Sequence, residues 1–87
     1  MKHPQAREDL TTLQARHRAF DARPHLGLPA RPRFNTAILC CIDARVDPAH
    51  VLGLELGDAV VLRNLGGRVD EGVEREVAFL SAMLRKW

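Results

Sequence analysis

The sequence predicts an α/β fold: a partial parallel β-sheet with flanking helices, preceded by an N-terminal helical arm. Two apolar runs of strand length predict the sheet, Thr36 to Ile42 and Asp58 to Asn64. A short helix is expected between the two runs, from Asp47-Pro48, and a helical stripe follows the second run. The order is therefore strand, helix, strand, helix. Strands joined by such crossovers pair in parallel, with right-handed connections.

Residues 1–33 are expected to form a basic helical arm and a proline-rich connector. A narrow apolar stripe at helical spacing covers Pro4 to about Phe20, at Ala6, Leu10, Leu13, His17 and Phe20. The helix is therefore expected to lie on another surface, with His17 as a half-buried packing residue. The prolines between Arg23 and Arg33 predict an extended connector.

Residues 34–87 are expected to form an incomplete α/β domain. Asp47-Pro48 predicts the start of a short helix through Leu52, because aspartate caps helices and proline fits their first turn. Gly66-Gly67 breaks the chain after the second strand. Asp70 then caps a helix to about Lys86, whose stripe consists of Val73, Val77, Leu80 and Leu84.

The composition excludes several classes. The chain has 87 residues, 46% hydrophobic and 28% charged, so it is a single soluble domain whose small core needs a partner, a metal or further sequence. No apolar run reaches the length of a membrane helix, and secretion by a signal peptide is not expected. The two cysteines are adjacent, which favours a reducing, cytoplasmic location. Residues 1–33 carry seven Lys/Arg against three acids, but without interleaved aromatic residues no nucleic acid is expected as a partner.

The chemistry-bearing segment is Cys40 to Pro48, at the carboxyl end of the first strand, where α/β sheets place their ligands. Arg45 can hold the Asp43 carboxylate with two parallel hydrogen bonds. Cys41 and Asp43 are then a plausible half of a zinc site, since zinc accepts sulfur and carboxylate oxygen. A cysteine-phosphatase loop is excluded, because the sixth position after either cysteine is not arginine. A Cys-x-x-Cys redox pair is also absent.

These residues resemble the β-class carbonic anhydrases. The segment from Cys41 to Pro48 is similar to that family's Cys-x-Asp-x-Arg signature, and Arg63 to Gly66 to its Arg-Asn-x-Gly motif. The resemblance implies that Cys41 ligates Zn²⁺. It also implies that Asp43 alternates between ligating zinc and accepting a hydrogen bond from zinc-bound water, while Arg45 holds Asp43 in the active arrangement. The implied enzyme is a lyase that converts carbon dioxide reversibly to bicarbonate.

One part of the family pattern is missing. The resemblance calls for a His-x-x-Cys motif on the next strand, and no histidine of this sequence is followed by cysteine at that spacing. The chain is therefore interpreted as a fragment, an N-terminal portion truncated before that motif, with the activity belonging mainly to the intact parent. His50 lies near the motif and is a candidate substitute ligand, but the favoured interpretation is a partly exposed helix residue.

Three functions stay open at this point. The parent is a carbonic anhydrase, or the chain is an inactive remnant that acts as an interaction module, or the fold serves another small heterocumulene such as carbon disulfide. The resemblance further implies a homodimer or higher oligomer that forms through the N-terminal arm.

Overall fold

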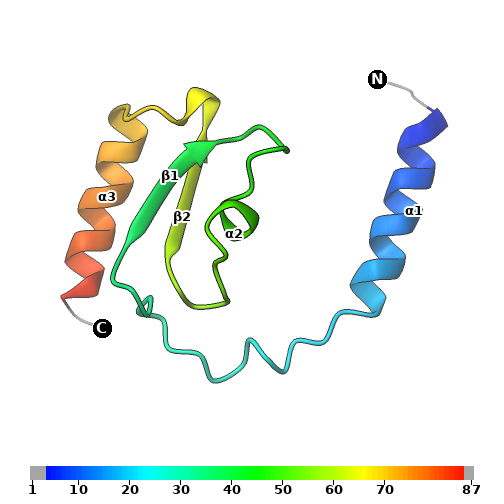
Figure 1. The fold of residues 1–87 in the computed structure, drawn as a ribbon, viewed down its shortest axis with the longest axis horizontal. Helices are drawn as coiled ribbons and strands as arrows, with labels where there is room; N and C mark the ends of the chain where they lie inside the picture. Colours follow the sequence, from blue (N-terminus) through cyan, green and yellow to red (C-terminus); the bar gives the residue numbers. More distant parts are fainter. Residues whose placement is uncertain (1–3, 86–87) are drawn as a thin grey trace.

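The computed structural model describes residues 4–85 and confirms the expected order of elements (Figure 1). The helix α1 (Pro4–Arg18) is followed by the strand β1 (Ala37–Cys41), the short helix α2 (Pro48–Val51) and the strand β2 (Val60–Asn64). A 3₁₀ turn, η1 (Leu65–Gly67), leads into the last helix, α3 (Glu71–Leu84). No helix within these residues is long and apolar enough to cross a membrane.

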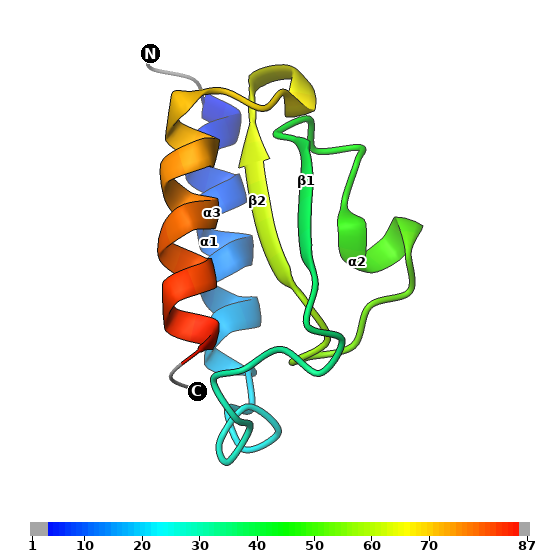
Figure 2. The ribbon, with the colours of Figure 1, turned by 90° about the vertical axis from the view of Figure 1, so that its left-hand side faces the viewer.

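The two strands pair in parallel, as predicted, with Ala37 opposite Val60 and Cys41 opposite Asn64. Side chains alternate along a strand, so β2 presents different residues to its two faces. Val60 and Leu62 lie beside α3, whereas Val61 and Arg63 lie beside α2. The two helices therefore cover opposite faces of the sheet, as Figure 2 shows. By the same alternation, Cys40 and Cys41 face opposite sides.

Helix α3 begins where the sequence predicts. The Asp70 carboxylate accepts a hydrogen bond from the Val73 N–H at 2.8 Å, and Glu71 and Glu74 lie in the first turn, where acids stabilise a helix. Val73 is 6% exposed, and apart from Pro32 and Pro48 it is the one buried apolar residue among those whose burial the structure describes. The helix ends at Leu84 with Arg85 as its C-cap, and Lys86, the expected end, lies outside the described residues.

Helix α1 lies apart from the sheet, at the end of a long connector (Figure 1). All residues from 5 to 31 are exposed. The expectation of a half-buried His17 is therefore wrong: its ring is exposed and stacks on Phe20, with ring centroids 6.1 Å apart. The physical reason is that no other described element packs against this helix. The radius of gyration reflects this, at 16.1 Å against about 12 Å for a compact chain of this length.

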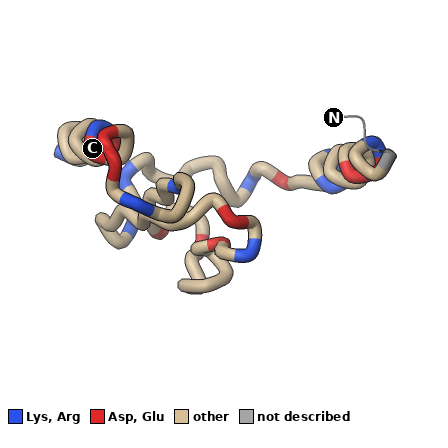
Figure 3. The backbone as a smooth tube through the Cα atoms, turned by 90° about the horizontal axis from the view of Figure 1, so that it is seen from above, with Lys and Arg blue, Asp and Glu red and all other residues tan. Residues whose placement is uncertain are grey.

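Charged side chains of both signs occur on α1 and α3 (Figure 3). On α1, Glu8 and Asp9 partly offset the arginines, and Arg16 and Arg18 stand in the last turn. Cations at that end of a helix are favourable because its carbonyl groups carry partial negative charge. The positive charge of the arm is therefore concentrated towards the connector.

The connector is attached to the α/β unit at its far end. The backbone N–H groups of Arg33 and Phe34 donate to the carbonyls of Gly57 and Asp58, at 2.7 and 2.9 Å. The Asp58 side chain is 4% exposed, accepts from the Arg33 guanidinium, and also accepts from the Glu55 N–H at 2.8 Å. Asp58 is thereby held in the turn, which explains why β2 begins at Val60 and not at Asp58.

Candidate metal centre

The predicted site residues lie together at the carboxyl end of β1. Cys41 is the last residue of the strand, and Asp43 and Arg45 belong to the loop that leads to α2. The Ile42 N–H donates to the Asn64 carbonyl at 2.9 Å, which continues the strand pairing one residue into this loop. The loop therefore starts from a fixed point on the sheet.

Asp43 and Arg45 form the two-point ion pair that their spacing predicts. The Arg45 Nε donates to Asp43 Oδ1 at 3.0 Å and its Nη2 donates to Oδ2 at 2.7 Å. The Arg45 backbone N–H also donates to Oδ1, at 2.8 Å. These bonds lower the pKa of Asp43, with a smaller contribution from the positive charge of Arg63. Asp43 is thus held as an oriented carboxylate.

The Cys41 thiol is half-buried and free. Its pKa is lowered, first because the Asp43 backbone N–H points at the sulfur and next because the Gly66 N–H does so. Donors aimed at a sulfur stabilise the thiolate, which is the form that binds metals. Cys40, on the opposite face, does not share these donors by the alternation of the strand.

Arg63 has a role that sequence reasoning missed. Its Nε donates to the Cys41 carbonyl at 3.0 Å, and its Nη2 donates to the carbonyls of Asp43 and Val46 at 2.8 and 2.7 Å. The motif containing Arg63 was recognised, but without a role for this side chain. The signal available was the strand register, which places Arg63 beside Cys40 at the end of the sheet.

The turn η1 packs closely on the same strand end. The Asn64 side chain accepts from the Arg68 N–H at 3.0 Å and donates to the Arg68 carbonyl at 2.6 Å, which closes the turn. Gly67 has a φ of +61°, and a Cβ there would lie 3.1 Å from the Cys41 nitrogen and 3.2 Å from the Cys40 carbonyl carbon. Only glycine fits such an approach to backbone atoms without displacement.

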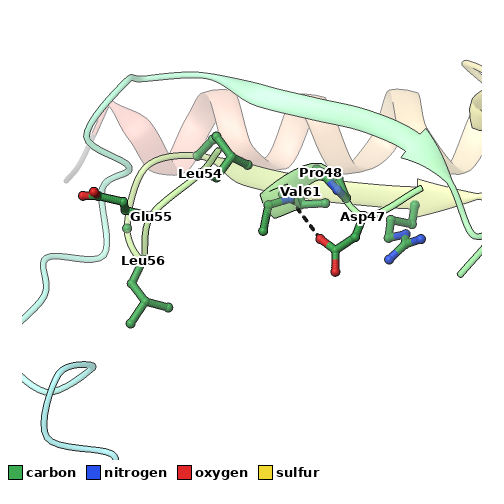
Figure 4. A pocket seen from close by; sticks show the side chains of 10 residues that line it. Asp47, Pro48, Leu54, Glu55, Leu56 and Val61 are labelled. Carbon is green, nitrogen blue, oxygen red and sulfur yellow. Dashed lines mark hydrogen bonds between the residues drawn. The ribbon is translucent and has the colours of Figure 1, made fainter. Parts of the chain in front are cut away.

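A pocket of about 340 Å³ opens on the α2 face (Figure 4). Its walls come from α2, the turn before β2 and the strand itself, and include Pro48, Leu54, Leu56 and Val61. Asp47 lies at one side, where its carboxylate caps α2 by accepting from the Ala49 N–H at 2.9 Å. Arg63 lines this pocket, whereas Cys41 and Asp43 do not.

Cys41 and Asp43 suit zinc in kind, since thiolate sulfur and carboxylate oxygen are both zinc ligands. They do not suffice in number. Residues 4–85 contain no group of three or more His, Cys, Asp or Glu side chains placed to hold a metal ion, and exposed His50 therefore does not complete the pair. The described part of the chain thus brings together two donors of the kinds that zinc accepts, and not a complete set of ligands.

Comparisons with known proteins show which chains this one resembles. The family model described as carbonic anhydrase matches residues 36–85. The β-carbonic anhydrases 1 of Mycobacterium tuberculosis and Mycobacterium bovis are 40% identical over 57 residues, which is 66% of this chain and 35% of theirs. A crystal structure of carbonic anhydrase from Streptococcus mutans superposes with a TM-score of 0.70 at 35% identity, covering 97% of this chain and 49% of that one.

The chain spans about a third of the length of these curated relatives. The match nevertheless contains both motifs, the two parallel strands and α3. On sequence and on fold, this chain belongs to the β-carbonic anhydrase family.

Proposed function

We propose that this chain provides the Cys41, Asp43 and Arg45 part of a zinc-dependent carbonic anhydrase, which hydrates carbon dioxide reversibly to bicarbonate. The observation that carries the proposal is the Asp43–Arg45 ion pair, held two residues from a thiol of lowered pKa at the end of β1. Family membership supports the reaction class.

The roles follow from the hydrogen bonds. Cys41, as a thiolate, would be a metal ligand; zinc, when bound, supplies a nucleophilic hydroxide at neutral pH. A carboxylate offers about four acceptor positions, and three donors of Arg45 occupy Asp43. Two of them share Oδ1, so Oδ2 retains an acceptor position. Asp43 can use it to orient the attacking group, while Arg45 fixes the direction of that oxygen.

The proposed zinc site needs ligands beyond this pair. Because zinc sites in proteins use three or four side chains, the remaining ligands come from outside residues 4–85. The 87-residue chain by itself is therefore expected to bind zinc weakly and not to hydrate carbon dioxide.

Zinc titration of the reduced chain tests the assignment of the thiol. Cys41→Ser is expected to abolish zinc binding, and the matched variant Cys40→Ser to retain it, because the two side chains face opposite sides of β1. Binding that depends on Cys40 and not on Cys41 would contradict the assignment.

Activity is tested in a fusion that adds the remaining part of the Mycobacterium tuberculosis relative after the matched region. Stopped-flow measurement with a pH indicator is expected to show carbon dioxide hydration. Asp43→Asn should lower kcat/KM by about 100-fold or more, the usual cost of losing a group that handles a proton. A folded, zinc-loaded fusion without hydration would refute the proposed function.

We also propose that the chain assembles with further copies of itself through α1. Leu10 and Leu13 are 61 and 57% exposed on α1, and Phe20, two residues after the helix, is 52% exposed, which leaves apolar side chains without cover on this arm. Replacing Leu10 and Leu13 by serine is expected to yield a monomer in light scattering, whereas Gln14→Ser is expected to leave the assembly intact. A wild-type monomer would exclude this assembly.

The two free thiols further suit a reducing compartment, and we propose the cytoplasm.

A further inference from the structure

Arg63, the residue before the last in β2, connects this strand to the loop that carries Asp43 and Arg45. It uses three N–H groups on three carbonyls, those of Cys41, Asp43 and Val46. The acceptors extend from the last residue of β1, Cys41, to Val46, two residues before α2. A guanidinium is suited to this because its donors lie in one plane at fixed angles.

Few other bonds hold this loop. Within it, the Val46 N–H donates to the Asp43 carbonyl at 3.0 Å, and the Arg45 N–H donates to Asp43 Oδ1. Apart from Arg63, the described residues link the loop to β2 through one backbone bond, from Ile42 to Asn64. Beyond Ile42, the hydrogen bonds that join the described loop to β2 therefore come from the Arg63 side chain.

Arg63 makes no ion pair with a carboxylate in the described part of the chain. Its charge is directed at backbone oxygens, and two of these belong to Cys41 and Asp43, the two donors of the proposed zinc site. The same guanidinium therefore fixes both donor residues relative to each other.

We propose that Arg63 is a positioning residue, whose guanidinium sets the placement of the Cys41 thiol and the Asp43 carboxylate by holding the carbonyls of the loop between them. The inference rests on the proposed function for its purpose, but its physical content is a statement about the loop in the absence of zinc.

The test is amide hydrogen exchange by NMR on the zinc-free 87-residue chain. In Arg63→Lys, which keeps the charge but loses the planar set of donors, the amides of Arg45 and Val46 are expected to exchange about tenfold faster or more. The capped amides of α3, at Val73 and Glu74, are expected to be unchanged. The matched control is Arg75→Lys, since Arg75 is exposed on α3 and its side chain makes no hydrogen bond or ion pair within residues 4–85.

A spectroscopic readout separates positioning from general stabilisation. The Arg45 Nε–H resonance reports its bond to Asp43 Oδ1, and in Arg63→Lys it is expected to shift and broaden while α3 resonances stay in place. Unchanged exchange and an unchanged Arg45 signal would overturn the proposal. An equal rise in exchange in the loop and in α3 would also overturn it, because Arg63 would then act on the whole fold.

If Arg63→Lys does not fold, Arg63→Gln is measured by the same criteria. The outcome is independent of zinc binding and of hydration. A failure here is thus distinguishable from a failure of the proposed function, which the Cys41 variants and the fusion report.

Discussion

Replacing Gly67 by alanine is expected to destabilise the chain and to disturb the strand end that carries Cys41. The new Cβ would lie 3.1 Å from the Cys41 nitrogen and 3.2 Å from the Cys40 carbonyl carbon. Both are backbone atoms of β1, and backbone atoms in a strand cannot rotate away as a side chain can. The turn η1 would have to move off the strand.

The magnitude is best measured against Gly53→Ala. Gly53 has a φ of +63°, almost the +61° of Gly67, but a Cβ at Gly53 would meet nothing within 4 Å. Each variant carries a backbone strain of about 1–2 kcal/mol, offset by about 0.4–1 kcal/mol from the reduced entropy of the unfolded chain. Gly67→Ala adds the overlap with β1, at about 1–3 kcal/mol.

Thermal unfolding followed by circular dichroism measures the difference between the two variants. Since each kcal/mol lowers Tm by about 4–8 °C in a chain of this size, Gly67→Ala is expected to melt about 5–20 °C below Gly53→Ala. Equal melting temperatures would refute the reasoning, because the contact between η1 and β1 would then make no energetic contribution.

Three further outcomes are expected. Asp70→Ala removes the carboxylate that caps α3 and should lower the free energy of unfolding by about 0.5–2 kcal/mol, measured by urea denaturation; an unchanged midpoint would argue against the cap. The Glu55 N–H and the Arg33 guanidinium lower the pKa of Asp58. The charge of Asp58 therefore stabilises the fold fully above the ordinary carboxyl pKa of about 3.9. This stability is lost as the pH falls through the lower pKa of the folded state. Asp58→Asn should therefore be less stable at neutral pH and less sensitive to acid, in melting curves across the acidic range. Cys41 should be alkylated by iodoacetamide at lower pH than a cysteine in an unfolded peptide, because its thiol pKa is lowered; coincident pH profiles, read by mass spectrometry, would contradict this.

The sequence was sufficient to predict the fold class and the local pair at its centre. Asp43 and Arg45 are two residues apart, so their contact depends on one loop and follows from spacing alone. The caps at Asp47 and Asp70 are equally local, and both helices begin where these residues predict. Parallel pairing followed from the helix between the strands.

The contacts that were missed join residues distant in sequence. Arg63 reaches carbonyls 17 to 22 positions earlier, and the motif that contains it does not say which atoms its side chain contacts. Asp58 was predicted as the first residue of β2, but its carboxylate is held by Arg33 and Glu55. The half-burial expected for His17 was wrong within this chain, because a helical stripe indicates which face needs a partner and not whether the partner is in the same chain.

The opposite orientations of Cys40 and Cys41 on β1 have a consequence for oxidation. A disulfide needs Cβ atoms that point towards each other, so these adjacent thiols cannot join without breaking the end of the strand. Under oxidising conditions each sulfur must instead react with another molecule, as a mixed disulfide or a cross-link between chains. The oxidised products of this protein should therefore depend on its concentration, and Cys40 and Cys41 should behave as two independent thiols and not as a redox pair.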